Sequence, residues 1–92
     1  MSPPESGGDS SPIELTRHAR EMLAERNIRQ EWLERTIRQP TLVEPDPVRP
    51  RVLRAFRRIA ERGNRVLRVV YARRAGTVRV VTAFFDRGAR LG

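Results

Sequence analysis

The chain of 92 residues carries 19 basic and 11 acidic side chains, which give a net charge of +8, and every basic side chain is an arginine. This length can bury the core of one small two-layer domain, which excludes the large α/β folds that hold organic cofactors. The chain has no cysteine and a single histidine, His18, so disulfides and zinc fingers are excluded and we expect no cofactor and no metal site. No apolar run is long enough to cross a bilayer and no signal-peptide pattern is present, so we expect a cytoplasmic protein without membrane contacts.

The first residues differ in composition from the rest of the chain. Residues 1–12 are rich in Pro, Gly and Ser and hold no large apolar side chain except Met1, which predicts a disordered tail before a single domain over residues 13–92. The charge is −2 in this tail, 0 over residues 13–50 and +10 over residues 51–92. Because a localised basic field attracts polyanions, we expect an anionic partner to bind the C-terminal half.

The first predicted helix begins in the neutral part of the chain. Thr16 is a residue type that caps helix N-termini, and Ala19, Met22 and Leu23 recur on one face. Asn27 is a common helix stop. We expect the apolar face of this helix to be buried.

A second helix is expected over about residues 29–39. It places Trp32, Leu33 and Ile37 on one face, and we interpret Trp32 as a core anchor rather than a platform for a ligand. Charged side chains are spaced for two i,i+4 ion pairs, Glu31 with Arg35 and Glu34 with Arg38. The helix ends before Pro40, because the residue before a proline disfavours helical geometry.

A short extended piece over residues 41–44 leads into a connector over residues 45–50, whose prolines do not fit regular structure. Residues 51–60 fit two patterns, since their apolar residues would also form a helical stripe. We interpret them as a strand, because residues 61–64 (Glu-Arg-Gly-Asn) suit a hairpin turn into the next strand.

Residues 65–72 and 77–85 are rich in β-branched and aromatic side chains and predict an antiparallel hairpin. A two-residue turn at Ala75-Gly76 sets the pairing of the residues that face the helices: Tyr71 with Val80, Val69 with Thr82, and Leu67 with Phe84. The predicted fold class is therefore α+β, with two N-terminal helices packed on one face of a three- to four-stranded antiparallel sheet.

The opposite face of this sheet would interleave arginines with apolar and aromatic residues: Arg54, Phe56, Arg58, Arg68, Val70, Arg79, Val81, Phe85 and Arg87. Guanidinium groups bind phosphate oxygens, and aromatic rings stack on unpaired bases. We predict RNA as the partner and the following nucleic-acid-binding residues: Phe56, Arg58, Arg79, Phe85 and Arg87. Alternatively, a coding bias for arginine merely supplies the charge of a solvated face, although such a bias does not explain why the excess is confined to one half.

Cleavage of RNA without a metal ion needs a base for the 2′-hydroxyl, cations for the crowded phosphate and an acid for the leaving oxygen. His18 is the candidate base, because the start of a helix keeps an imidazole neutral, and Arg54 and Arg68 are the candidate cations. A histidine in a first helical turn is also a common capping or packing residue. The other proton carriers are Tyr71, Asp86, Asp46 and Glu61, and no general acid or carboxylate cluster for Mg²⁺ is evident.

Several segments together resemble the family called domain of unknown function 4258: Thr16-Arg-His-Ala-Arg-Glu-Met-Leu-Ala-Glu-Arg-Asn-Ile28, Gln39-Pro40, Val43-Glu44-Pro45-Asp46, Arg54-Ala-Phe-Arg57, Arg65-Val-Leu-Arg-Val-Val-Tyr71 and Val80-Val-Thr-Ala-Phe-Phe-Asp-Arg87. The resemblance covers nearly all of residues 13–90. It implies a layout similar to the RelE/ParE and BrnT toxins of bacterial toxin–antitoxin pairs, in which two N-terminal helices pack on a sheet whose other face cuts or binds RNA.

The resemblance also implies which residues serve a site: His18, Arg54, Arg68, Thr82 and Asp86. One position departs from the family, because Met22 stands where an arginine is common, and Arg26 on the next turn would compensate only partly. If that arginine serves a site, part of the site is lost. The predicted pairing directs Thr82 toward the helices, so a site that Thr82 shares with Arg68 would require another register.

We therefore expect a small RNA-binding protein similar to RelE and BrnT, either a ribonuclease toxin of a toxin–antitoxin pair or a descendant of one, with a cognate antitoxin as a candidate partner. The alternative is a non-catalytic module that binds nucleic acid or protein. A third interpretation is a self-associating or antitoxin-docked protein, with Phe56 and Phe85 in the interface.

Overall fold

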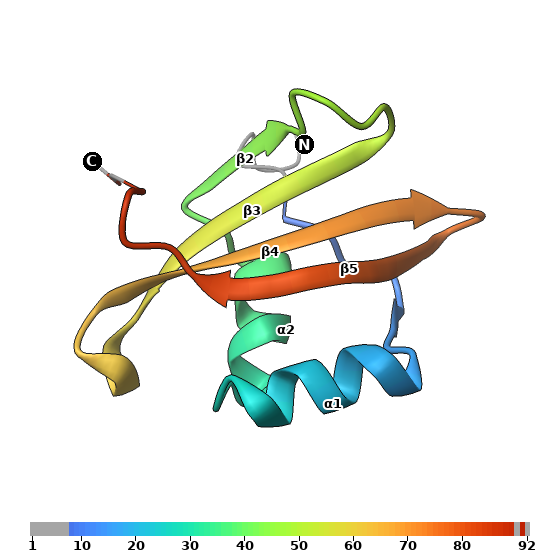
Figure 1. Ribbon diagram of the computed structural model, residues 1–92. Helices are drawn as coiled ribbons and strands as arrows, with labels where there is room; N and C mark the ends of the chain where they lie inside the picture. The colour runs from blue at the N-terminus through green and yellow to red at the C-terminus, as the bar shows by residue number, and fades with distance from the viewer. Residues whose placement is uncertain (1–7, 90, 92) are drawn as a thin grey trace.

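The computed structural model describes residues 8–89 and 91 (Figure 1). Within these residues the chain forms two α-helices, five strands and one 3-10 turn: β1 (Ile13–Glu14), α1 (Arg17–Glu25), α2 (Gln30–Arg38), β2 (Leu42–Pro45), β3 (Val52–Ile59), η1 (Ala60–Arg62), β4 (Arg65–Arg74) and β5 (Thr77–Phe85). None of these helices is long and apolar enough to span a membrane.

The described strands form one sheet in the order β1-β5-β4-β3-β2, and both helices lie on the same face of it (Figure 1). The predicted α+β class is confirmed. The sheet differs from the predicted three or four antiparallel strands because it has five, and because β1 pairs in parallel with Val78 and Arg79 of β5. Two residues are too few to show the alternation by which a strand is recognised in a sequence.

Helix α1 begins and ends where the sequence predicts. The Oγ1 of Thr16 accepts a hydrogen bond from the Ala19 N–H at 3.0 Å, which satisfies one of the free donors of the first turn. Asn27 adopts a left-handed backbone with φ 56°, a conformation that asparagine tolerates better than most residues. Met22 and Leu23 are buried against the sheet, as expected from their spacing.

Helix α2 buries Trp32, Leu33 and Ile37, which confirms Trp32 as a core residue. The two predicted i,i+4 ion pairs on its surface are absent from the described contacts. Arg35 instead donates two hydrogen bonds to Glu61 at 2.9 and 2.8 Å, and Arg38 donates to backbone carbonyls of the N-terminal segment. Partners from other elements thus replace the neighbours on the helix, and for Arg35 the two-pronged contact with a carboxylate is stronger than an exposed single one.

Residues 8–12 belong to the predicted tail, and the structure places them against α2 and β4. Asp9 is 5% exposed, its N–H donates to the carbonyl of Ile37 at 3.0 Å and its carboxylate accepts from Arg73 at 2.8 Å. Arg38 donates to the carbonyl of Asp9 at 2.9 Å. This part of the predicted tail is therefore bound to the domain, and residues 1–7 lie outside the described part of the chain.

The strand predicted over residues 51–60 is present as β3, over residues 52–59, and it pairs with β4 around a turn centred on Arg62. The β4–β5 turn has Ala75 and Gly76 at φ 49° and 76°, the geometry of a tight two-residue hairpin. The predicted register holds from this turn to the pair Tyr71–Val80 and is wrong beyond it, because a bulge at this point of β5 adds one residue.

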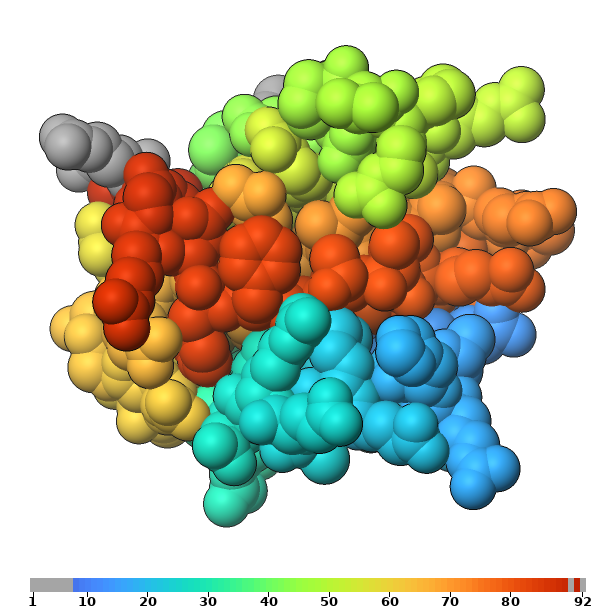
Figure 2. All heavy atoms as spheres, viewed as in Figure 1, coloured from blue at the N-terminus to red at the C-terminus, as the bar shows by residue number. Residues whose placement is uncertain are grey.

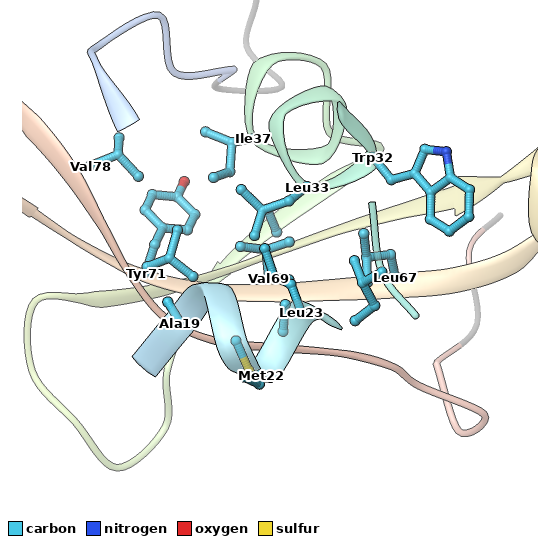
Figure 3. Close-up of a cluster of buried hydrophobic side chains, with 14 of the residues drawn as sticks. Ala19, Met22, Leu23, Trp32, Leu33, Ile37, Leu67, Val69, Tyr71 and Val78 are labelled. Carbon is cyan, nitrogen blue, oxygen red and sulfur yellow. The ribbon is translucent and has the colours of Figure 1, made fainter. Parts of the chain in front are cut away.

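The bulge changes which side chains face the helices. Val69 pairs with Ala83 rather than Thr82, and Leu67 pairs with Phe85 rather than Phe84. The core therefore lies between the helices and one face of the sheet and contains Leu67, Val69, Tyr71 and Val78 from the strands (Figure 3). Phe85 packs against this core, whereas Phe84 points to the opposite face, which we call the open face.

Candidate functional site

Three of the residues singled out in the sequence meet on the open face. Arg54 of β3 and Arg68 of β4 lie over the ring of Phe56, with their guanidinium carbons 5.9 and 5.2 Å from its centroid. The same group of Arg68 lies 5.0 Å from the centre of the Phe84 ring. Strand alternation and the bulge thus build a stack of arginine and aromatic side chains in the middle of the sheet.

Both arginines of this stack are paired with carboxylates. Arg54 forms an ion pair with Glu44 of β2, and Arg68 forms one with Asp86, directly after β5. Asp86 also accepts a hydrogen bond from the Gly88 N–H at 2.9 Å. The two pairs neutralise the charge in the middle of the open face, so the guanidinium groups there are already bound to acids of the same chain.

The end of the described chain folds over this stack. Leu91 packs on Phe56 and Val66, and Arg58 donates to the Leu91 carbonyl at 3.0 Å. Phe56 is only 3% exposed as a result. The prediction that Phe56 offers a free ring to an unpaired base is therefore wrong for this structure, because Leu91 and the two arginines cover the ring.

A cationic pocket of about 270 Å³, which we call the Arg58 pocket, lies where the β3–β4 turn meets the segment after β5. Its described lining residues are Arg58, Asn64, Arg65, Val66, Phe85, Asp86, Arg87 and Ala89. Three arginines thus line one small volume, and the single acid among these residues is the Asp86 that pairs with Arg68. Such an arrangement attracts an anion with several oxygen atoms.

A second hollow has a volume of about 380 Å³, and Asp86 and Ala89 line both this hollow and the Arg58 pocket. The other described residues that line it are Leu42, Glu44, Phe56, Arg68, Gly88 and Leu91. Apolar side chains and two carboxylates that are each paired with an arginine distinguish this second hollow from the cationic Arg58 pocket.

His18 does not join Arg54 and Arg68. It lies exposed in the first turn of α1, which covers the face of the sheet opposite to the open face (Figure 1). Because Leu67 and Val69 point to the helices, Arg68 between them points away from them. The predicted catalytic group of His18 with the two arginines is therefore wrong, since the sheet separates the base from the cations.

The remaining predicted residues divide between the pocket and other places. Arg58 and Arg87 line the Arg58 pocket. Phe85 lines it from the helix side, where its ring lies 4.7 Å from the Arg65 guanidinium and 6.3 Å from the Trp32 ring, so its predicted place on the open face is wrong. Arg79 lies elsewhere, exposed on β5, and pairs with Glu14 at 3.1 Å.

Thr82 takes part in a contact between the helix and the sheet. Its hydroxyl donates to the Sδ of Met22 at 3.3 Å and accepts from the Nη1 of Arg26 at 3.1 Å. Arg26 also donates to the carbonyl of Ala83 at 2.7 Å, a backbone group of the sheet edge. The position where the family commonly has an arginine is thus filled by an apolar contact, and Arg26 binds Thr82 from the next turn.

Of the other candidate proton carriers, three do not line the Arg58 pocket: Tyr71, Asp46 and Glu61. Burial raises the pKa of Tyr71, whose ring is in the core. Backbone hydrogen bonds from Arg49 and Val48 lower the pKa of Asp46 to about 2. Glu61 is bound to Arg35. Asp86 is therefore the carboxylate in the pocket, and no group of three or more potential metal ligands occurs among the residues that the structure describes.

Sequence reasoning missed Asn64, Arg65 and Phe84 as residues of this region. Arg65 pairs with the buried Ile59 at the end of β4, and this strand end brings it beside Arg58 and Arg87. Phe84 was missed because nothing in the alternation of residues 77–85 signals the bulge. The residues of the pocket therefore come from two chain segments whose meeting depends on the turn and the strand ends.

Comparisons with known proteins agree with one part of this description. A family model described as Domain of unknown function (DUF4258) matches residues 15–85. No curated protein and no solved structure matches the chain.

Proposed function

The chain belongs to the family described as domain of unknown function DUF4258, and from the geometry of its own residues we propose that it binds RNA at the Arg58 pocket. The observation that carries the proposal is the grouping of Arg58, Arg65 and Arg87 around about 270 Å³, with their one neighbouring acid committed to Arg68. A guanidinium donates two parallel hydrogen bonds to phosphate oxygens. A phosphodiester in the pocket would therefore meet donors from several directions.

The neighbouring hollow supports a nucleotide rather than a small inorganic anion as the ligand. The hollow shares the lining residues Asp86 and Ala89 with the Arg58 pocket and is lined in part by apolar side chains. An unpaired base fits such a surface, and its amino groups are donors for the carboxylates of Glu44 and Asp86. With a phosphate in the first pocket and a base in the second, the site would bind a single strand.

The choice of RNA over DNA rests on the similarity in layout to the RelE/ParE and BrnT toxins, in which two helices pack on one face of a sheet. We propose that this chain is likewise a toxin of a toxin–antitoxin pair or a descendant of one. It would act in the cytoplasm, with a cognate antitoxin as its partner. Direct contacts to the 2′-hydroxyl would distinguish the two nucleic acids.

Ribonuclease activity is the second candidate function, and Asp86 is the observation that favours it. This carboxylate stands between the arginines of the pocket and the adjoining hollow, where a base for the 2′-hydroxyl is needed. The ion pair with Arg68 would have to open for Asp86 to accept a proton. Binding therefore has the stronger support, and cleavage is the additional step.

Fluorescence anisotropy with a labelled single strand of about 12 nucleotides tests the binding proposal. The variant R58Q/R65Q/R87Q removes the three pocket charges, and R17Q/R20Q/R29Q removes three exposed charges from the helix side as a matched control. For single strands the slope of log affinity against log salt changes by about 0.7 for each phosphate bound, so with one phosphate in the pocket we expect the slope of the pocket variant to be smaller by about 0.7. Equal reductions in both variants, or no binding by the unaltered protein, would refute the proposal.

A cleavage assay on the same RNA separates the second candidate from the first. If Asp86 acts as the base, Asp86→Asn abolishes cleavage while the anisotropy signal persists, and His18→Ala cleaves like the unaltered protein. Intact RNA with the unaltered protein at saturating binding would leave a binding module. Cleavage that disappears with His18→Ala would contradict the placement of His18 outside the site.

A further inference from the structure

Another hollow lined by arginines lies at the end of the sheet opposite to the Arg58 pocket. It has a volume of about 570 Å³, and its described lining residues are Pro50, Arg51, Ala72, Arg73, Arg74 and Ala75. The connector before β3 and the β4–β5 turn meet here, and both project from the same end of the molecule, yellow-green above orange in Figure 2. We call this volume the Arg51 hollow.

The charges around the Arg51 hollow are less neutralised than those in the middle of the open face. Of its three arginines, Arg73 uses its Nε to bind the buried Asp9 at 2.8 Å and stays 54% exposed. Arg51 and Arg74 are exposed, and neither forms an ion pair with any acid of the described residues. No carboxylate belongs to the described lining. Three like charges placed together in this way favour an anion as occupant.

The backbone at Arg51 supplies an independent observation. Its φ is 65°, in the left-handed region, which costs a residue with a Cβ roughly 1 kcal/mol or more relative to glycine. The adjacent Val52 pairs with Ala72, so the strained residue stands at the point where the connector enters the sheet. Backbone strain of this kind is concentrated at functional sites. An arginine at a position that favours glycine or asparagine therefore indicates that its side chain contributes to binding.

We propose that the Arg51 hollow binds a phosphate group, and that this phosphate belongs to the same RNA strand whose other end occupies the Arg58 pocket. The second part of this inference rests on the proposed function, whereas the first part does not. Strand β4 runs from Arg65 beside one volume to Arg74 beside the other. Ten residues at about 3.3 Å each separate the two ends by roughly 30 Å. That distance corresponds to roughly nine nucleotides at the 3.4 Å spacing of a stacked strand.

Two variants test the hollow without disturbing the core. Arg51→Gly removes the guanidinium and relieves the strained backbone, so it is expected to keep or raise the melting temperature while it weakens phosphate binding. Arg74→Gln removes an exposed charge. If Arg51 only shaped the connector, Arg51→Gly would leave phosphate binding unchanged, which separates a structural role from a binding one.

Titration with inorganic phosphate, followed by NMR of the arginine Nε–H groups, tests the hollow apart from any RNA. We expect the signals of Arg51, Arg73 and Arg74 to shift in the unaltered protein. In R51G/R74Q the shift of Arg73, the arginine that remains, should disappear. R17Q/R20Q is the matched control and should behave like the unaltered protein. Phosphate that moves none of these signals would overturn the phosphate site.

Oligonucleotides of different length test the RNA part. For a strand of about 12 nucleotides, R51G/R74Q should lower the salt slope by about 0.7 for each phosphate that the variant no longer binds. A strand of about four nucleotides cannot reach both ends, so R51G/R74Q should lower its affinity by a smaller factor than it lowers that of the longer strand. A phosphate shift without any dependence on length would leave free phosphate as the ligand and overturn the RNA anchor. If R58Q/R65Q/R87Q binds RNA like the unaltered protein, the proposed function fails, and the phosphate titration still decides the hollow.

Discussion

The buried carboxylate of Asp9 holds the N-terminal segment to the domain, so Asp9→Ala is expected to destabilise the fold. The side chain is 4% exposed and accepts hydrogen bonds from the Ser11 N–H and the Arg73 Nε, both at 2.8 Å. A hydrogen bond to a charged group contributes about 1.5–3 kcal/mol, but Arg73 is 54% exposed, so solvent screening reduces its contribution to about 1 kcal/mol or less. The expected loss is therefore about 2–3 kcal/mol, or a fall in Tm of about 10–20 °C for a domain of this size.

The same carboxylate predicts a dependence on pH. Burial alone would raise the pKa of Asp9, but hydrogen bonds from Ser11 and Arg73 outweigh burial and hold the pKa below its ordinary value. A carboxyl group whose pKa is lower in the folded protein stabilises the fold above its unfolded pKa of about 3.9, and this stability is lost as the pH falls through the folded value. The difference in Tm between the unaltered protein and Asp9→Asn should be constant near neutral pH and shrink below about pH 4.

Thermal unfolding followed by circular dichroism between about pH 3 and pH 8 measures both effects. Glu14→Gln is the matched control, because Glu14 also pairs with an arginine of the sheet but is 52% exposed, which limits its contribution to about 0.5 kcal/mol. A Tm of Asp9→Ala that equals that of Glu14→Gln would refute the reasoning. It would mean that the Asp9 carboxylate contributes no more to the stability of the domain than the exposed Glu14 carboxylate does.

Three further predictions concern the turn, a surface ion pair and the core. Ala75→Asn should raise the free energy of unfolding by about 0.5–1 kcal/mol in urea denaturation, because asparagine tolerates the left-handed φ of 49° at this turn position better than alanine does. Hydrogen bonds from Arg35 lower the pKa of Glu61 to about 2. The Glu61 carboxylate therefore stabilises the fold above its unfolded pKa of about 4.3, and this stability is lost as the pH falls to about 2. Glu61→Gln should remove this part of the acid dependence of Tm. Ile37→Ala should cost about 2–5 kcal/mol because the side chain is fully buried, whereas Val48→Ala, at an 84% exposed position, should leave the chemical unfolding midpoint unchanged.

The sequence patterns that depend on near neighbours predicted most of the fold. Thr16 as a helix cap, the strand over residues 51–60 and the pairing of Tyr71 with Val80 each depend on a few adjacent residues, and each is confirmed. The bulge in β5 escaped prediction because Val80 and Val81 are equally good strand residues, and nothing local states that one of them is extra. One unpaired residue was enough to exchange the faces of Phe84 and Phe85.

The candidate site was harder to predict because its residues depend on contacts between distant segments. His18 is a suitable base by residue type, but residue type does not state on which side of the sheet its helix packs. Phe56 is on the predicted face, yet Leu91, 35 positions later in the chain, covers it. Arg58 and Arg87 were predicted from alternation, and only the turn geometry brings Arg65 beside them.

The excess of arginine has a different meaning once its pairing is known. In the middle of the sheet the positive charge is neutralised locally, because Arg54 and Arg68 pair with Glu44 and Asp86. At the two ends, the Arg58 pocket and the Arg51 hollow are each lined by three arginines. Among the described residues, Asp86 lines the Arg58 pocket but pairs with Arg68, and Asp9 pairs with Arg73 of the Arg51 hollow. A coding bias for arginine would distribute unpaired charge without regard to position. A strand of regularly spaced phosphates, held at both ends and free of strong attraction in between, accounts for this distribution better than a uniformly basic surface does.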